Sequence, residues 1–400
     1  MSQTSSSPFT QSELLPQEEM LELSKTKGQL FIGIPKEISY QEKRVCLTPD
    51  AVSALTANGH RVLIEKGAGN YAKFSDQDYS EAGAEITNDK NKIFSCPIIL
   101  KVAPLCDEEL EIIHPQTTLI SALQLKTRNK KYFQKLAEKR ITALAFEFIK
   151  DEFGTYPAVR TLSEIAGSAS ILIAAELLAK VDEANGLMLG NISGVPPTEV
   201  VIIGAGTVGE FAAKSAIGLG ASIKVFDSSI TRLRHLRENL SHHIFTSTIQ
   251  PKSLTKALRR ADVVIGAVGG KNRSPVIVSK KMVQKMKKGA VIIDVSIDMG
   301  GCVETSEITN HNKPTKVIDD VIHYCVPNIP SRYPRTSSMS ISNIFTPYLL
   351  HIAEEGGIEN TLRYEKGLRN GLYLYHGILT NKSVANWFDM DYKDPNLLIF

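Results

Sequence analysis

The 400-residue sequence lacks the features that mark several classes of protein. Its five cysteines are odd in number and form no Cys-x-x-Cys pair, which argues against a disulfide framework. Neither cysteine nor histidine shows the spacing of metal ligands, so we expect no metal site. No uninterrupted apolar run reaches the ~18–20 residues that cross a bilayer. The formal net charge of +3 is small for this length, so we expect neither nucleic acid nor a membrane surface as a partner.

The remaining composition is that of an ordinary globular protein, with 42% hydrophobic and 22% charged residues. Such a chain can bury sizeable cores, and its length predicts two domains of ~100–200 residues each. Residues 1–28 are rich in Ser, Gln and Glu and have neither the basic nor the apolar region of a secretory signal. We therefore expect a polar N-terminal arm, unpaired thiols and a cytoplasmic location.

The most informative segment is a run of β-branched residues, 199–203, that leads into the turn Gly204-x-Gly206-x-x-Gly209. In a dinucleotide-binding turn the first glycine makes the tight bend from strand to helix. The second lets the backbone approach a pyrophosphate, and the third lets the helix pack on the strand. The free N–H groups of the helix N-terminus then face the phosphates. Glycines also serve plain turns, so the motif alone is weak evidence.

The residues after the turn strengthen this interpretation. A helical pattern follows at 211–219, and a second apolar run at 223–226 ends on Asp227, eighteen positions after Gly209. A carboxylate there accepts hydrogen bonds from an unphosphorylated ribose and repels a 2′-phosphate, which favours NAD over NADP. Strand, glycines, helix, strand and acid in this order predict dinucleotide binding rather than a structural turn.

Two sets of strand-like runs alternate with helical patterns. The first set lies at 30–34, 61–65, 98–102, 118–122 and 142–146, and the second at 199–203, 223–226, 262–267, 290–294 and 321–326. Such alternation is typical of right-handed βαβ units and parallel sheets. We therefore predict an α/β protein with two doubly wound parallel-sheet, Rossmann-like domains.

A long helical pattern at 163–183, with Ser163 as its N-cap, is expected to join the two domains. A second long pattern at 342–355 follows a loop rich in Pro, Ser and Arg, which carries the chain back to the first domain. We expect an NAD-binding Rossmann domain at residues 161–330, inserted in a substrate domain made of residues 29–160 and 331–400.

Polar residues follow the apolar runs at places where an open α/β sheet binds ligands, namely the carboxyl ends of its strands. They are Arg44, Lys101, Gln124, Asp298 and Asn328. Hydride transfer on a small acid requires a cation for the carboxylate, a group that polarises the carbonyl or imine, and a proton carrier. Arginine, lysine and aspartate are suited to these tasks.

Each of these residues also has a simpler interpretation. Lys101 at a strand end could be a solvated side chain, and Arg44 could pair with Glu37 or Glu42 on the surface. Asp298 is the stronger candidate, because the two glycines that follow Met299 allow a ligand to approach closely.

Many segments, in order, resemble the alanine dehydrogenase and pyridine nucleotide transhydrogenase α-subunit family, alanine dehydrogenase most closely. They cover roughly residues 30–380 and include Gly33-Ile-Pro-Lys-Glu37, Arg44-Val-Cys-Leu-Thr-Pro49, Asn58-Gly-His-Arg-Val62, Gly67-Ala-Gly69, Lys101-Val, Leu162-Ser-Glu-Ile-Ala-Gly167, the turn Gly204 to Gly209, Asp294-Val-Ser-Ile-Asp-Met-Gly-Gly301, Val326-Pro-Asn-Ile-Pro330 and Pro334-Arg-Thr-Ser337. The resemblance implies NAD-dependent oxidative deamination of L-alanine to pyruvate and ammonium, and the reverse reaction. It also implies a homo-oligomer, since many members are hexamers.

The resemblance implies roles for individual residues. Arg44 and Lys101 would bind the substrate, and Lys101, Asp298 and Gln124 would act in catalysis. The residues implied around NAD are Ser163, Gly204, Gly206, Thr207, Val208, Gly209, Asp227, Val268 and Asn328.

One departure from the family bears on chemistry. Where alanine dehydrogenases carry an acid/base histidine in a Leu-His-Leu segment, this chain has Leu123-Gln124-Leu125. An amide does not titrate near neutral pH, so proton transfer would fall to Lys101, Asp298 or water, or activity on alanine would be weak. Two alternatives stay open: an NAD(H)-binding transhydrogenase subunit, and an NAD-binding sensor or scaffold with weakened catalysis.

Overall fold

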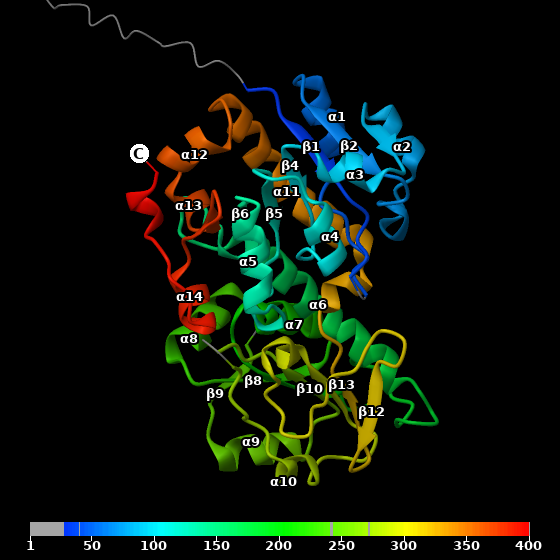
Figure 1. Cartoon of the computed structure of the whole chain (residues 1–400). Helices are drawn as coiled ribbons and strands as arrows, with labels where there is room; N and C mark the ends of the chain where they lie inside the picture. The colour runs from blue at the N-terminus through cyan, green and yellow to red at the C-terminus, as the bar shows by residue number, and fades with distance from the viewer. Residues whose placement is uncertain (1–27, 40, 241–242, 271–272, 400) are drawn as a thin grey trace, which may run out of the picture.

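The computed structural model describes residues 28–39, 41–240, 243–270 and 273–399. The predicted N-terminal arm, residues 1–28, therefore lies outside the described residues except for Gly28. Two lobes are visible in Figure 1, and the chain forms one β-sheet in each. These sheets confirm the predicted pair of α/β domains.

The first sheet has eight strands in the order β15-β14-β6-β5-β4-β1-β2-β3. Their bounds are β1 Phe31–Ile34, β2 Arg61–Glu65, β3 Glu85–Thr87, β4 Ile98–Leu100, β5 Thr118–Ser121, β6 Thr142–Ala145, β14 Leu372–Tyr375 and β15 Ile378–Leu379. Strands β1 to β6 pair in parallel, whereas β14 runs antiparallel to β6 and to β15. The sheet is therefore mixed at one edge, and that edge comes from the C-terminal part of the chain.

The second sheet has seven strands in the order β12-β13-β11-β10-β7-β8-β9. Their bounds are β7 Glu199–Ile203, β8 Ser222–Asp227, β9 Phe245–Thr248, β10 Val263–Gly266, β11 Val291–Asp294, β12 Thr315–Ile318 and β13 Val321–Tyr324. All pair in parallel except β12, which is antiparallel to β13. The strand order reverses between β7 and β10, which is the switch point where such sheets bind ligands.

Helices connect the strands and cover the sheets. In chain order they are α1 Pro49–Ala57, α2 Asp76–Glu81, α3 Lys90–Phe94, α4 Asp107–Ile112, α5 Lys130–Glu138, α6 Pro157–Leu178, α7 Thr207–Gly218, α8 Ile230–Asn239, α9 Pro251–Leu258, α10 Lys280–Val283, α11 Pro334–Glu354, α12 Ile358–Tyr364, α13 Lys366–Arg369 and α14 Lys382–Phe388. Helix α11 starts at residue 334, earlier than the predicted 342, so part of the predicted return loop is helical.

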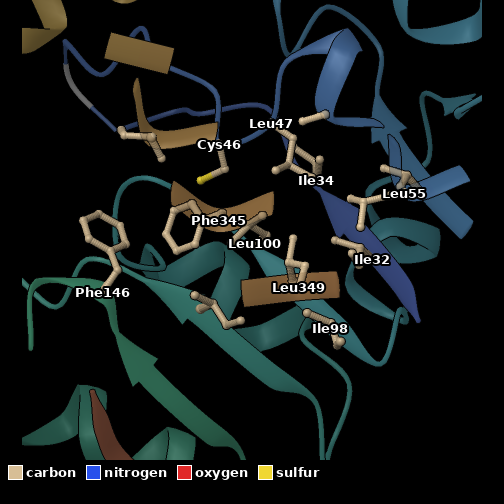
Figure 2. Packing of buried hydrophobic residues seen from close by; sticks show 14 of the residues in the cluster. Ile32, Ile34, Cys46, Leu47, Leu55, Ile98, Leu100, Phe146, Phe345 and Leu349 are labelled. Carbon is tan, nitrogen blue, oxygen red and sulfur yellow. The ribbon is translucent and has the colours of Figure 1, made fainter. Parts of the chain in front are cut away.

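Helix α11 brings the chain back to the first sheet. Phe345 and Leu349 on this helix belong to the same buried cluster as Ile32 of β1 and Leu100 of β4, and Figure 2 shows their packing. Burying side chains of this size contributes roughly 1.5–3 kcal/mol each. The first domain is therefore completed by residues that follow the second sheet in the sequence.

Helix α6 joins the two domains, as predicted, but its start differs from the prediction. It begins at Pro157 and ends at Leu178, so Ser163 lies inside the helix and is not its N-cap. Proline is favoured at the first helical position because its fixed φ suits the helix and its missing N–H is not needed there. Gly167 allows α6 to approach α7 closely, since a Cβ at this position would lie 2.3 Å from the Val208 carbonyl oxygen.

Among the described residues, α6 is also the one helix long and apolar enough to cross a membrane, with a mean hydropathy of 1.4. Gly167, Ser168 and Ser170 interrupt its apolar residues, so the sequence shows no long continuous apolar run here. Half of its most apolar 18-residue stretch is buried inside the protein. The helix packs there against α7 and α11. A core helix meets the same test, so this is weak evidence for a membrane span.

Candidate active site

The glycine turn joins β7 to α7. Gly204 has φ +113°, and a Cβ there would lie 2.2 Å from the Ala267 carbonyl oxygen. A Cβ at Gly209 would lie 1.9 Å from the Gly204 carbonyl oxygen. The protein's own packing therefore requires both glycines. At Gly206, in contrast, a Cβ would meet nothing within 4 Å.

The protein's own packing therefore does not require a glycine at position 206, and the space beside it is open. Gly206 is the N-cap of α7, makes no side-chain cap and has a φ of −84°, which any residue adopts. Thr207 and Val208 form the first turn of this helix. The first N–H groups of a helix have no partner within it and carry partial positive charge, so they suit phosphate oxygens.

Asp227 ends β8 beside the glycine turn. It is buried, and its two oxygens accept hydrogen bonds from the backbone N–H groups of Ala205 and Ser229, both at 2.7 Å. Each oxygen keeps a further lone pair, so the carboxylate can still accept from ribose hydroxyls. The guanidinium of Arg232 lies 4.0 Å from it.

The loop after β11 is held by Asp294. This buried carboxylate accepts hydrogen bonds from the backbone N–H groups of Ser296, Cys302 and Val303 and from the Ser306 hydroxyl, at 2.7–3.2 Å. Burial raises its pKa, and these donors oppose the rise. Asp294 thus fixes the 3₁₀ turn η5, Val295–Met299, which carries Asp298.

The same turn contacts the loop after β10. The Ser296 hydroxyl accepts a hydrogen bond of 2.9 Å from the backbone N–H of Val268. Val268 therefore lies at the carboxyl end of β10, adjacent to Gly204, whose Cβ position is 3.2 Å from the Val268 nitrogen. The predicted cofactor residues of β7, β8 and β10 thus gather at the switch point.

Arg44 follows β1 and is buried. Its Nε and Nη2 each donate a hydrogen bond of 2.7 Å to Glu42, so the two side chains form a bidentate pair. The alternative that Arg44 pairs with Glu42 is therefore correct, but the pair does not lie on the surface, since only 5% of the Arg44 side chain is exposed. Arg44 Nη1 is buried and has no hydrogen-bond partner within the described part of the chain.

Asn328 connects Arg44 to the second domain. Its amide Nδ2 donates to Glu42 at 3.0 Å, and its backbone N–H donates to Asp298 at 3.2 Å. Asp298 is exposed as a residue, but desolvation of its carboxyl group by the surrounding protein raises its pKa to about 6, while the hydrogen bond from Asn328 and the charges of Arg44 and Lys126 lower it. The predicted residues Arg44, Asp298 and Asn328 therefore form one cluster.

Lys101 follows β4 and is not solvated. Its side chain is fully buried, and its ammonium lies 2.5 Å from Glu109 and 3.4 Å from Glu37. Burial alone would lower the pKa of Lys101, but the two carboxylates outweigh it and raise the pKa. Lys101 therefore stays charged and can donate a hydrogen bond to a carbonyl oxygen.

Gln124 stands apart from this cluster. Its backbone is left-handed, with φ +48°, and its N–H donates a hydrogen bond of 3.0 Å to Glu147. The side chain is exposed, and no hydrogen bond joins it to Arg44, Lys101 or Asp298 in the described structure. The following turn does reach the second domain, since the ammonium of Lys126 lies 3.4 Å from the Met299 sulfur.

Sequence reasoning missed the buried partners of the two cations. The sequence suggests Glu37 and Glu42 only as surface partners of Arg44, and it does not single out Glu109 or Glu147. One available signal was that a buried cation needs a carboxylate. Ser163 is half-buried on the second turn of α6, and no hydrogen bond links it to the glycine turn in the described structure. Where the chain is described, no group of three or more His, Cys, Asp or Glu side chains is placed to hold a metal ion.

The fold and the site together define a two-domain α/β protein of the nucleotide-dependent dehydrogenase class. Residues 33–166 match the model of the alanine dehydrogenase/PNT N-terminal domain, and residues 170–382 match that of the alanine dehydrogenase/PNT C-terminal domain. The chain belongs to the alanine dehydrogenase/PNT family, as its sequence motifs indicated.

Similar proteins support this assignment over most of the chain. Alanine dehydrogenase 2 of Staphylococcus aureus (strain USA300) is 38% identical over 366 residues, which cover 90% of this chain and 97% of that protein. A solved L-alanine dehydrogenase has a TM-score of 0.84 at 33% identity and covers 89% of this chain and 98% of its own. The transhydrogenase from Sinorhizobium meliloti has a TM-score of 0.74 at 20% identity, with 88% and 99% covered, and shows the fold alone.

Proposed function

We propose that the protein catalyses the reversible, NAD-dependent oxidative deamination of L-alanine to pyruvate and ammonium. The observation that carries the proposal is Arg44 Nη1, a buried guanidinium nitrogen without an acceptor. A buried donor left unpaired costs ~1–3 kcal/mol, and more when charged. A substrate carboxylate supplies the missing acceptor, because Glu42 already holds the other side of the guanidinium fork.

The other site residues have roles that follow from their chemistry. Lys101 donates a hydrogen bond to the substrate carbonyl or imine and favours attack at that carbon. Asp298, whose pKa of about 6 lies near neutrality, accepts and returns protons at the substrate nitrogen and oxygen. Gln124 supplies an amide that donates and accepts hydrogen bonds but does not titrate. NAD, held at the glycine turn Gly204–Gly209, would supply the hydride acceptor for this reaction.

The residues at the switch point fit NAD. The open space at Gly206 and the start of α7 at Thr207 and Val208 suit the pyrophosphate. Asp227 suits ribose hydroxyls and would repel a 2′-phosphate, although Arg232 at 4.0 Å weakens that repulsion. We place Ser163, Gly204, Gly209, Val268 and Asn328 around the same cofactor.

A pair of glycine variants tests the cofactor site. Gly206→Ala should fold normally and bind NADH more weakly, because its Cβ enters open space at the N-terminus of α7, where we expect the pyrophosphate. Gly218→Ala, on the same helix and also in open space, is the matched control and should bind normally. Fluorescence titration with NADH and NADPH measures the loss of NADH affinity and the preference for NADH over NADPH. Equal affinity of the two glycine variants for NADH would contradict the proposed pyrophosphate site at Gly206.

Activity is tested by NADH formation from L-alanine and NAD at alkaline pH. Arg44→Ala and Lys101→Ala should each abolish turnover while NADH still binds. Arg61→Ala, which removes an exposed arginine paired with Glu85, is the control and should keep full activity. The proposal fails if a screen of L-amino acids, and of 2-oxo acids with ammonium and NADH, yields no turnover.

We further propose that the nucleotide domain spans residues 161–330, inserted in a substrate domain of residues 29–160 and 331–400. A homo-oligomer, a hexamer as in many family members, is part of this proposal. Its support is a set of exposed apolar side chains on α6 and the loop after it, namely Leu172, Met188, Ile192 and Val195. Light scattering after gel filtration measures the assembly. A cytoplasmic location agrees with five free cysteines.

The second candidate is a sensor that binds NAD(H) with little catalysis, and the exposed amide of Gln124 is the observation that favours it. Tight NADH binding without turnover of any amino acid would support it. The transhydrogenase alternative is disfavoured, because the relatives that share 38% identity are named alanine dehydrogenases.

A further inference from the structure

The buried site holds more acids than bases. Its buried carboxyl groups outnumber its buried cations three to two, Glu37, Glu42 and Glu109 against Arg44 and Lys101, and the exposed Asp298 adds a fourth acid beside them. If all were ionised, the site would already carry net negative charge before an anionic substrate arrived. Charges in such surroundings interact far more strongly than in water, so a further carboxylate would favour protonation of one of the acids.

Among these acids, Glu37 is the one whose charged form is least stabilised by hydrogen bonds. Glu42 uses both oxygens for Arg44. Glu109 uses one oxygen for Lys101 and the other for the backbone N–H of Cys106, at 2.9 Å. Glu37 Oε1 accepts from the backbone N–H groups of Val102 and Ala103, but Glu37 Oε2 has no hydrogen bond in the described structure, only the ammonium of Lys101 at 3.4 Å.

Groups on several elements face Glu37. Lys101 after β4 attracts its negative charge, whereas Glu42 in its own loop and Glu109 on α4 repel it. Burial is the largest influence, and the balance raises the pKa of Glu37 to about 7. Arg44 lies close enough for Glu37 to raise the pKa of its guanidinium. The carboxyl group can therefore change its charge near neutral pH, whereas Gln124 cannot.

We propose that Glu37 takes up one proton from solvent on Oε2 when an anionic 2-oxo acid binds, and releases it when the zwitterionic amino acid takes its place. The inference rests on the proposed function. Pyruvate adds one negative charge beside Glu37 through its carboxylate at Arg44, whereas L-alanine brings an ammonium as well and adds none. Glu37 acts through Lys101 and the charge of the site, and is a positioning residue rather than a catalytic one.

The test is calorimetric titration of pyruvate into the protein–NADH complex at pH 8, with ammonium omitted so that no amination follows. Repeating it in buffers of different ionisation enthalpy gives the number of protons taken up. The wild-type protein should take up between half a proton and one proton, and its dissociation constant should weaken by about tenfold per pH unit above this pH. Glu37→Gln should take up none and show a flat pH dependence. The matched control Glu108→Gln, an exposed neighbour on α4, should behave as wild type.

The outcomes separate the two proposals. No binding of pyruvate to the wild-type protein would refute the proposed function. Binding with the same proton uptake in Glu37→Gln would overturn the role of Glu37. If that variant does not fold, infrared difference spectra of wild-type protein with isotope-labelled glutamate decide the matter. A new protonated-carboxyl band from glutamate on pyruvate binding supports the inference, and its absence overturns it.

Discussion

Replacing Gln124 with histidine should raise the rate of alanine oxidation. Gln124 is exposed with φ +48°, a region that histidine enters more readily than most residues, so the change adds little strain. The backbone N–H that donates to Glu147 is kept, because the substitution alters only the side chain. The variant thus adds one titratable group to a loop whose position stays the same.

The magnitude follows from what a general base contributes, typically 10²–10⁴-fold. We expect a gain at or below the lower limit of that range, about 10- to 100-fold in kcat or ~1.4–2.7 kcal/mol, because Lys101 and Asp298 remain and already carry part of the proton transfer. The rate should also gain a limb that rises with pH near the ordinary histidine pKa of about 6.5.

The assay is steady-state NADH formation across pH for the variant and a matched control. Gln116→His is that control, because Gln116 is also exposed and left-handed, with φ +64°, but precedes β5 instead of following it. It should leave kcat unchanged. An unchanged or lower kcat in Gln124→His would refute the reasoning, since it would show that a base at this position does not serve the site.

Three further predictions concern stability, pH and the glycine turn. Glu42→Gln breaks the buried pair with Arg44 and should cost about 3–5 kcal/mol of unfolding free energy in urea titrations; an unchanged midpoint would mean the pair adds nothing. Lys126→Met removes a cation that lowers the pKa of Asp298, so the acidic limb of kcat should move to higher pH, above its position near 6, and an unmoved limb would contradict this. Gly209→Ala places a Cβ 1.9 Å from a carbonyl oxygen and should abolish NADH binding together with native circular dichroism, whereas binding at wild-type affinity would show that the turn can shift.

The strands that the sequence predicts correctly are those buried on both faces. Strand β7 reads Val-Val-Ile-Ile after Glu199 and is recognisable as an apolar run, because helices cover both sides of a parallel sheet. The missed strands β3, β9, β12 and β15 lie at sheet edges, and the first three are half-buried or exposed and carry mixed polar sequences. Strand β14 is also missed, although it is buried and lies between β15 and β6. Edge strands therefore depend on the tertiary context that a local pattern lacks.

The site residues also divide into those that a local sequence pattern predicts and those that depend on tertiary contacts. The glycine turn and Asp227 were found because local backbone geometry requires those residue types at those spacings. The pairing of Lys101 with Glu37 and Glu109 depends on how β1, β4 and α4 meet, which no sequence spacing contains. The protonation of the site is thus a tertiary property, even where each residue was visible in the sequence.

The C-terminal origin of one sheet edge has a consequence for biosynthesis. Strand β6 ends at residue 145, but its partner β14 begins at residue 372, after the whole second sheet. At about 5–20 residues per second, a ribosome takes roughly 10–50 s between them. During that interval the nascent chain exposes an unpaired apolar strand, which is a template for aggregation and a site where a chaperone would bind. The second sheet is contiguous in the sequence and can fold before strands β14 and β15 of the first sheet have been synthesised.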